Sequence, residues 1–483
     1  MKKLLGSTLA LAMFMPAGAN AEVLKNFKMS GQIDIQTTSA NNVKDFATRD
    51  NGGNLNNDRI GQATTRLMLK MDWDLLDDVH SRLTLAKGAA VASGAGASRP
   101  YGMTGATGES LTTAQTEIIV GEANVKVDKL FGAVDLTMGR QFYGELGDPM
   151  IYYGPRGNFG LTMTAIDMFR ADWSGEHMKV TGIAGKTTDG TLIQDGAAAA
   201  ATDLRGLVLS CMKHENVKPT VYLYNQLTHA TGGAGTITGK NSNLYLLGAK
   251  ANITIGGLTA RVEVAKNFGE DRTTAGLSKN YAGSAFYGKA GYKLDVEGAA
   301  AVTPWAEFGL GTGDKDSSVA TGGGDNRNQE FKAIVTSWHP GAIYARFHNN
   351  SAIPMTSNIA VPAGAAGNVT TSQGLSNRVI WGFGVKANPA AVKQLTAGLQ
   401  YYRTTFHRVA PITINGVANQ TPSKAIGSEV DVTADWKHSE NVTLKLTAGS
   451  FQPGKYFKDY RQGTTNDLLN PATMLAADVQ IKF

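Results

Sequence analysis

The chain has 483 residues, a formal net charge of +6, 57 glycines and a single cysteine, Cys211. Beyond residue 21 no apolar run approaches the ~20 residues that a membrane helix needs, which excludes a helical membrane protein. One cysteine excludes an intramolecular disulfide framework. The small excess of positive charge gives no reason to expect nucleic acid as a partner.

The N-terminus has the pattern of an export signal. Met1, Lys2 and Lys3 form a basic start, residues 4–16 are mostly apolar, and Ala19-Asn20-Ala21 offers a cleavage site. We therefore expect residues 1–21 to be a signal peptide that is removed. Residues 22–483 show no linker, composition break or repeat, so we expect them to form one domain.

Segments of about ten residues with a period of two follow along the chain. In residues 66–73, Leu67, Leu69 and Met71 share one face, while Arg66 and Lys70 share the other. Residues 258–267, 395–401, 426–436 and 475–483 alternate in the same way. One apolar and one ionisable face over this length is typical of transmembrane β-strands. Strands of soluble sandwiches are shorter, ~5–6 residues on average.

The connections alternate between short and long. Short turns are expected at residues 74–78, 128–131, 174–176, 214–216, 256–257, 297–301, 339–341, 388–391 and 437–441. Longer polar stretches lie at 39–59, 88–114, 142–163, 187–201, 229–242, 268–280, 314–328, 350–376, 406–424 and 452–472. Nine short turns imply about twenty strands. We therefore predict an all-β fold: a single transmembrane antiparallel up-and-down β-barrel of about 18–20 strands, with short periplasmic turns and long extracellular loops.

The tryptophans and the last residue support this prediction. Five of the six tryptophans lie near predicted short turns, as an interfacial aromatic girdle requires; they are Trp73, Trp173, Trp305, Trp338 and Trp436. Phe483 ends an alternating strand. A C-terminal aromatic on such a strand resembles the recognition signal of bacterial outer-membrane barrels. We expect a Gram-negative outer-membrane location, with membrane lipid and, through Phe483, the barrel-assembly machinery as partners.

Gly139-Arg140-Gln141 stands before a loop, and Asp167, Arg170 and Asp172 follow in the next strand. With this order, residues 115–175 resemble the alginate-export family of large outer-membrane porins. The resemblance implies a monomeric barrel of eighteen strands that passes an anionic polysaccharide through an arginine-rich pore. The turn count favours about two strands more.

Alternation along the strands predicts which side chains line the lumen. A channel needs a polar lining and a constriction, and no catalytic residue. The lining candidates are the ionisable residues opposite the apolar faces: Arg66, Lys70, Arg82, Glu122, Lys126, Arg170, Asp172, Arg261, Glu263, Lys289, Lys293, Arg346, Glu429, Asp431 and Asp435. Because both signs occur in long stretches, we expect a transverse field and weak charge selection. Strict alternation turns Arg140 outward unless a bulge redirects it.

The connection at 142–163 is the candidate constriction loop. It is long and glycine-rich and carries Tyr143, Tyr152, Tyr153, Arg156 and Phe159. Such a loop either folds into the lumen and narrows it or remains an ordinary extracellular loop.

The leading hypothesis is therefore an outer-membrane porin for passive diffusion of small hydrophilic solutes. The alternative is a substrate-specific channel for an oligosaccharide, a polysaccharide or another anionic solute. We expect no enzyme, cofactor or metal, because no nucleophile–base group stands out and the histidines lack metal-ligand spacing. The pattern is compatible with a monomer or a homotrimer.

Overall fold

The computed structural model describes residues 25–483 except 44–45, 47–58, 88–117, 159, 189–200, 230–231, 234–235, 238–239, 273–277, 315–325, 348–373, 410, 415–416 and 462–468. The expected signal peptide and Phe159 therefore lie outside the described residues, as do parts of several predicted loops. Among the described residues, no helix combines the length and the apolar character needed to cross a membrane.

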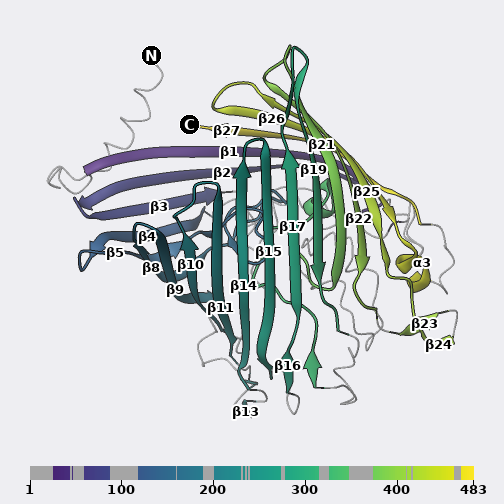
Figure 1. Ribbon diagram of the computed structural model, residues 1–483, viewed down its shortest axis with the longest axis horizontal. Helices are drawn as coiled ribbons and strands as arrows, with labels where there is room; N and C mark the ends of the chain where they lie inside the picture. The colour runs from purple at the N-terminus through teal and green to yellow at the C-terminus, as the bar shows by residue number, and fades with distance from the viewer. Residues whose placement is uncertain are drawn as a thin grey trace.

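The described chain forms a closed antiparallel β-barrel (Figure 1). One sheet contains 21 strands, of which β16 (Lys279–Tyr281), β18 (Leu294–Val296) and β20 (Arg327–Asn328) are short extensions, which leaves eighteen in the wall. Each wall strand pairs with its successor, and the last pairs with the first. In chain order they are β1 (Lys25–Asn41), β2 (Arg59–Leu76), β3 (Val79–Lys87), β4 (Ile118–Leu130), β5 (Val134–Gln141), β8 (Ile166–Ser174), β9 (Met178–Thr188), β10 (Thr202–Cys211), β11 (Val217–Thr228), β14 (Ser242–Ile255), β15 (Leu258–Asp271), β17 (Ser284–Tyr292), β19 (Ala300–Gly311), β21 (Arg378–Pro389), β22 (Leu395–Phe406), β25 (Ala425–Lys437), β26 (Val442–Pro453) and β27 (Ala472–Lys482).

The remaining elements belong to the connections. They are the two-stranded pairs β6 (Tyr143–Gly144) with β7 (Tyr152–Tyr153), β12 (Gly232–Gly233) with β13 (Thr236–Ile237) and β23 (Ile412–Ile414) with β24 (Val417–Gln420), and the helices α2 (Ala342–Phe347) and α3 (Lys455–Arg461).

The eighteen wall strands lie at the lower end of the predicted 18–20 and are two fewer than the turn count implies. Eight of the nine predicted short turns join neighbouring wall strands at one end of the barrel. The ninth, at 339–341, lies inside the single connection between β19 and β21. The described part of that connection holds β20 and α2 and contributes no strand to the wall. The described apolar residues of this connection pack inside the barrel, as the burial of Phe331, Ile334 and Trp338 shows.

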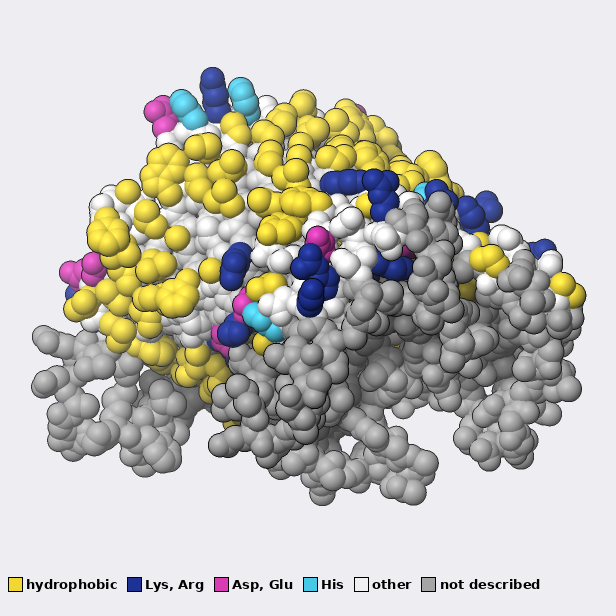
Figure 2. All heavy atoms as spheres, turned by 90° about the horizontal axis from the view of Figure 1, so that it is seen from below, with side chains coloured by type: hydrophobic (Ala, Val, Ile, Leu, Met, Phe, Trp, Pro, Cys, Tyr) yellow, Lys and Arg dark blue, Asp and Glu magenta, His cyan; other side chains and the backbone are white. Residues whose placement is uncertain are grey.

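The outer surface of the wall is apolar. Leu67, Leu207 and Val432 are 39%, 47% and 54% exposed and belong to the outward face of their strands. Figure 2 shows such side chains as a broad band on one side of the molecule. An outward apolar face of this kind is typical of transmembrane β-strands.

The tryptophans divide between the two faces of the wall. Trp173 and Trp436 are 38% and 37% exposed on the outer face near short turns, as predicted. Trp305 instead packs against buried Tyr402, with ring centroids 5.8 Å apart, and Trp338 is 6% exposed inside the barrel. The girdle prediction is therefore wrong for Trp305 and Trp338, which fill the lumen.

The seam between the first and last strands depends on Gly31 and Phe483. The two residues exchange backbone hydrogen bonds, Gly31 N to Phe483 O at 2.7 Å and Phe483 N to Gly31 O at 3.0 Å. The Phe483 ring covers Gly31, and a Cβ added there would lie 2.3 Å from the ring. A glycine covered by an aromatic ring is a recognised device for stabilising a strand pair.

We predict that Gly31→Val displaces the Phe483 ring and weakens barrel closure. Overpacking of this kind costs roughly 1–3 kcal/mol. The measurement is the denaturant midpoint of the refolded protein, read from the heat-modifiable band on a gel. Gly61→Val in β2 is the matched control, because no atom lies within 4 Å of a Cβ added there. Equal midpoints for the two variants would contradict this account of the seam.

Candidate functional site

The connection at 142–163 folds into the lumen. Tyr143, Tyr152 and Tyr153 are 9%, 7% and 4% exposed. Arg66 of β2 holds the far end of the loop by donating from Nη1 to the carbonyl oxygens of Arg156, Leu161 and Thr162 at 2.9, 3.1 and 3.3 Å. Asp34 of β1 pairs with the same guanidinium at 2.7 Å. A buried arginine with five donors is suited to this task, since it satisfies several loop carbonyls at once.

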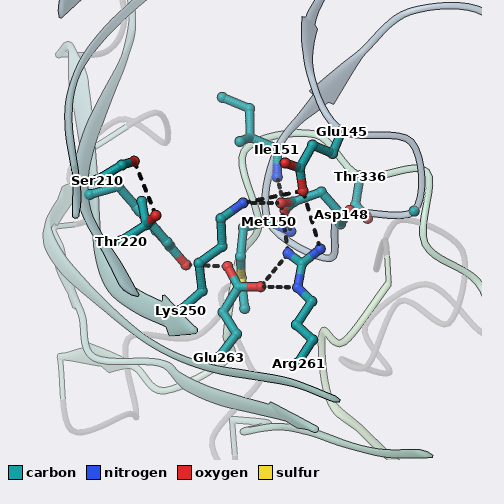
Figure 3. Close-up of polar contacts among 12 residues, drawn as sticks. Glu145, Asp148, Met150, Ile151, Ser210, Thr220, Lys250, Arg261, Glu263 and Thr336 are labelled. Atoms are coloured by element: carbon teal, nitrogen blue, oxygen red, sulfur yellow. Dashed lines mark hydrogen bonds and ion pairs between the residues drawn. The ribbon is translucent and has the colours of Figure 1, made fainter. Parts of the chain in front are cut away.

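Asp148 fixes the other end of the loop to the opposite wall (Figure 3). Its Oδ2 accepts from Lys250 Nζ of β14 at 3.1 Å and from Arg261 Nη2 of β15 at 2.7 Å. Its Oδ1 accepts the backbone N–H groups of Met150 and Ile151 at 2.8 and 3.1 Å. Burial alone would raise the pKa of Asp148, but Lys250 and Arg261 hold that pKa below its ordinary value.

A second inward segment, residues 329–347, meets this loop at the middle of the lumen. Ile151 and Val335 form a parallel β-bridge. Tyr152 N donates to Val335 O at 2.8 Å, and Thr336 Oγ1 donates to Asp148 O at 2.7 Å. The loop and the segment thus form one partition across the barrel, which we call the septum.

Carboxylates on the wall hold the second segment. Trp338 donates its indole N–H to Glu307 of β19 at 2.7 Å. At the start of α2, the N–H of Ala342 donates to Asp431 of β25 at 2.9 Å, and Ile343 N donates to Glu429 at 2.6 Å. Carboxylates suit this position because the first N–H groups of a helix have no partner within it.

Arg346 was expected on a strand, and the structure corrects this. It lies on α2, in the lumen, where its Nη2 contacts Asp478 of β27 at 2.5 Å and its Nη1 donates to Thr38 of β1 at 3.0 Å. Arg346 therefore fastens the septum to the barrel seam. Alternation could not reveal this role, because the residue belongs to no strand.

Two of the cavities that the described residues form lie on the short-turn side of the septum. The larger, of about 790 Å³, lies against β1–β5, β8 and β9 and includes Asp72, Arg82, Glu122 and Lys126 in its lining. The smaller, of about 430 Å³, separates the loop from β8–β14. Arg170 and Lys179 line both, which makes the two cavities neighbours along one wall.

Opposite charges face each other across the smaller cavity. The wall contributes the cations Arg170, Lys179, Lys218 and Lys250, and the loop contributes the acids Glu145 and Asp148. Tyr143 closes one side through its hydroxyl, 3.0 Å from that of Tyr224, and the Arg170 guanidinium lies 6.0 Å from the Tyr143 ring centre. A solute in this cavity would therefore experience a field directed from wall to loop.

The predicted lining residues fall into two groups. The first group is buried where the septum meets the wall: Arg66, Glu263, Glu429 and Asp431. Arg66, Glu429 and Asp431 bind the septum directly, and Glu263 binds Arg261, which in turn binds Asp148. Others form ion pairs on the inner wall: Lys70 with Asp72, Arg82 with Asp72, Lys126 with Asp128, Arg170 with Asp172, Arg261 with Asp148, Lys289 with Glu307 and Asp435 with Lys445. Glu122 accepts from Thr84 at 2.8 Å, and Lys293 pairs with Asp295 next to the short-turn end.

Asp148, Glu307 and Trp338 were not among the predicted site residues. Asp148 and Trp338 lie in connections, where alternation does not apply, but the parity of β19 already placed Glu307 opposite Phe308 and Leu310. Arg140 faces outward, as strict alternation predicts, and forms a bidentate pair with Asp167 at 2.8 and 2.7 Å.

The fold is shared with known outer-membrane proteins. No protein-family model and no curated protein matches the sequence. Among solved structures, the outer membrane protein OprD from Pseudomonas aeruginosa matches with a TM-score of 0.52 and 10% identity over 95% of this chain and 94% of that one. OpdK from the same organism, solved with vanillate, matches with a TM-score of 0.52 and 9% identity over 95% and 99%. OccK8 (OprE), also from P. aeruginosa, matches with 0.52 and 10% over 95% and 99%.

At this identity the likeness establishes the fold alone. The shared fold is a closed β-barrel, and it gives no support to the alginate-export resemblance.

We predict that Asp148→Asn loosens the septum. Removing one partner of a buried ion pair costs about 3–5 kcal/mol, because Lys250 and Arg261 lose a charged acceptor. The expected result is a larger and noisier single-channel conductance. Glu145→Gln is the control: this side chain is 65% exposed at the same cavity, and a pair of that kind contributes about 0–1 kcal/mol. Identical current traces for wild type and Asp148→Asn would disprove the anchoring role.

We also predict that the septum resists mild acid. The pKa of Asp148 is lower in the folded protein than its ordinary value near 3.8, so its contribution is complete above that value and is lost as the pH falls through the lower, folded pKa. Any change in conductance that comes from Asp148 should therefore appear only below about pH 4. A titration of channel current on wild type and Asp148→Asn isolates this effect, since the variant has no carboxyl to protonate. An Asp148-dependent transition near pH 6 would contradict it.

Proposed function

We propose that this protein is an outer-membrane channel of the porin type, through which small hydrophilic solutes diffuse passively. The observation that carries the proposal is the pair of adjoining cavities, about 790 and 430 Å³, that lead along a charged inner wall to the septum. A closed barrel with a polar interior and an apolar exterior suits this task, because its wall needs no further covering in lipid.

The proposal includes location and assembly. The apolar outer band and the fold shared with outer-membrane proteins support insertion in the bacterial outer membrane. Short turns would then face the periplasm and long connections the exterior. Export through a signal peptide at residues 1–21 and recognition of Phe483 by the assembly machinery complete the proposal. In this scheme the septum is the constriction, and no step requires a catalytic residue.

One observation favours a more selective channel. Four cations and two acids line the smaller cavity, and among the described residues no ion pair or hydrogen bond involves the side chain of Lys218. An excess of positive charge beside hydroxyl groups such as those of Ser210 and Thr220 suits an anionic solute that carries hydroxyls. A substrate-specific channel for such a solute is therefore the second candidate.

Single-channel recording of the refolded protein in a planar bilayer tests both functions. We expect stable ohmic steps and a mild preference for anions. Lys179→Glu combined with Lys218→Glu should shift the reversal potential toward cation selectivity, because both side chains line the smaller cavity. Lys293→Glu, beyond the cavities, is the control and should leave the potential unchanged. Block by an anionic sugar would favour the selective channel, and silence from a folded barrel would refute both.

A further inference from the structure

A row of charged side chains crosses the outer wall at the long-connection end of five successive strands. Arg140 is next to last in β5, Asp167 is second in β8, Lys186 is third from the end of β9, and Asp203 is second in β10. These positions alternate with outward apolar residues such as Phe169, which is 61% exposed, so the charges face away from the lumen.

The row is continuous from strand to strand. Arg140 is the cross-strand partner of Asp167, Asp167 of Lys186, and Lys186 of Asp203. Ion pairs join Arg140 to Asp167 at 2.7 Å and Lys186 to Asp203 at 3.0 Å. His229, which follows β11, contacts Asp203 at 3.0 Å through Nε2. The charged groups thus share one level of the wall, where the apolar band ends.

Arg205 is the exception in this row. It lies two residues from Asp203 on the same outward face of β10, and its side chain is exposed. Its cross-strand neighbours, Ala184 and Asn225, carry no charge. Within the described chain, no ion pair or hydrogen bond involves its guanidinium. Apart from His229, the row therefore has three basic groups and two acids. Arg140 and Lys186 each pair with an acid, and Arg205 has no such partner in the described chain.

The surroundings of Arg205 are apolar on the side that faces the middle of the wall. Leu207 and Leu223 are 47% and 38% exposed there. Figure 2 shows charged side chains of both signs gathered at the edge of an apolar band. On the described outward faces of β26, β27 and β1, no charged side chain occupies the corresponding end. The row therefore does not extend to these three strands.

We propose that this row binds the phosphate group of a phosphorylated lipid in the outer leaflet. Arg205 would donate hydrogen bonds to the phosphate oxygens, because a guanidinium offers paired donors that match them. Lys186 and Arg140 beside it would add positive charge. Leu207 and Leu223 would receive the acyl chains. The acids Asp167 and Asp203 keep the neighbouring cations in place and limit binding to one headgroup. The proposal rests on the outer-membrane location proposed above.

The test is native mass spectrometry of the refolded barrel titrated with diphosphoryl lipid A in detergent. The comparison ligands are the same lipid without phosphates and inorganic phosphate. We expect one lipid A to bind and the dephosphorylated lipid to bind at least roughly tenfold more weakly. Inorganic phosphate alone should bind poorly, because the apolar part of the site would be empty. Equal binding of both lipids would overturn the proposal.

Variants locate the site. Lys186→Gln with Arg205→Gln should weaken lipid A binding roughly tenfold, while heat-modifiability and channel conductance stay as in the wild type. Arg403→Gln is the matched control, since Arg403 is an exposed outward arginine on β22 with Trp381 as its cross-strand partner. The proposal would be overturned if the double variant bound lipid A as well as the wild type does. It would also be overturned if the wild type formed a lipid-free dimer that the double variant does not form. A folded wild-type barrel that conducts no current would instead refute the proposed function.

Discussion

The pairing of the first and last strands is the constraint on which the rest of the structure depends. An apolar medium offers no hydrogen-bond partner, so every backbone N–H and C=O group of a wall within it must pair inside the protein. Ten residues of β1 are in register with β27, and Phe483 completes the seam over Gly31. Closure then fixes which face of each strand points outward, and alternation distributes apolar and polar side chains accordingly.

Closure also leaves a wide interior, which the septum partly fills. An eighteen-stranded wall encloses more space than its own side chains can fill. Two connections enter this space and bring backbone groups that need partners. The wall supplies partners for these groups: Arg66 for the loop carbonyls, and Glu429 and Asp431 for backbone N–H groups of the second segment. Glu307 accepts from the indole N–H of Trp338. Charges buried in this way are costly unless paired, which explains why most of them are paired or hydrogen-bonded.

Ion pairing on the inner wall also limits how many charged groups are left for a solute to contact. Many ionisable groups on the inner wall neutralise one another, as Arg82 and Asp72 do at 2.7 Å. Of the four cations beside the smaller cavity, Arg170, Lys179 and Lys250 pair with acids, and Lys218 has no ion pair among the described residues. The outer face of the described wall is mainly apolar, and charged side chains such as the row near Arg205 lie toward its long-connection end. The two surfaces of one sheet thus present different chemistry to the lumen and to the outside of the barrel.

The sequence by itself determined the strand period, eight of the turns and the closing strand at Phe483, because each is a local pattern. It also placed Arg66, Glu263 and Glu429 on the inner face, since alternation specifies a face without reference to the rest of the chain. Only the tertiary structure decided that residues 329–347 leave the wall, that Asp148 meets Thr336 across 188 positions of sequence, and that Trp338 lies inside. Periodicity reports which face of a segment is apolar, and an apolar face packs equally well against lipid or inside a filled lumen.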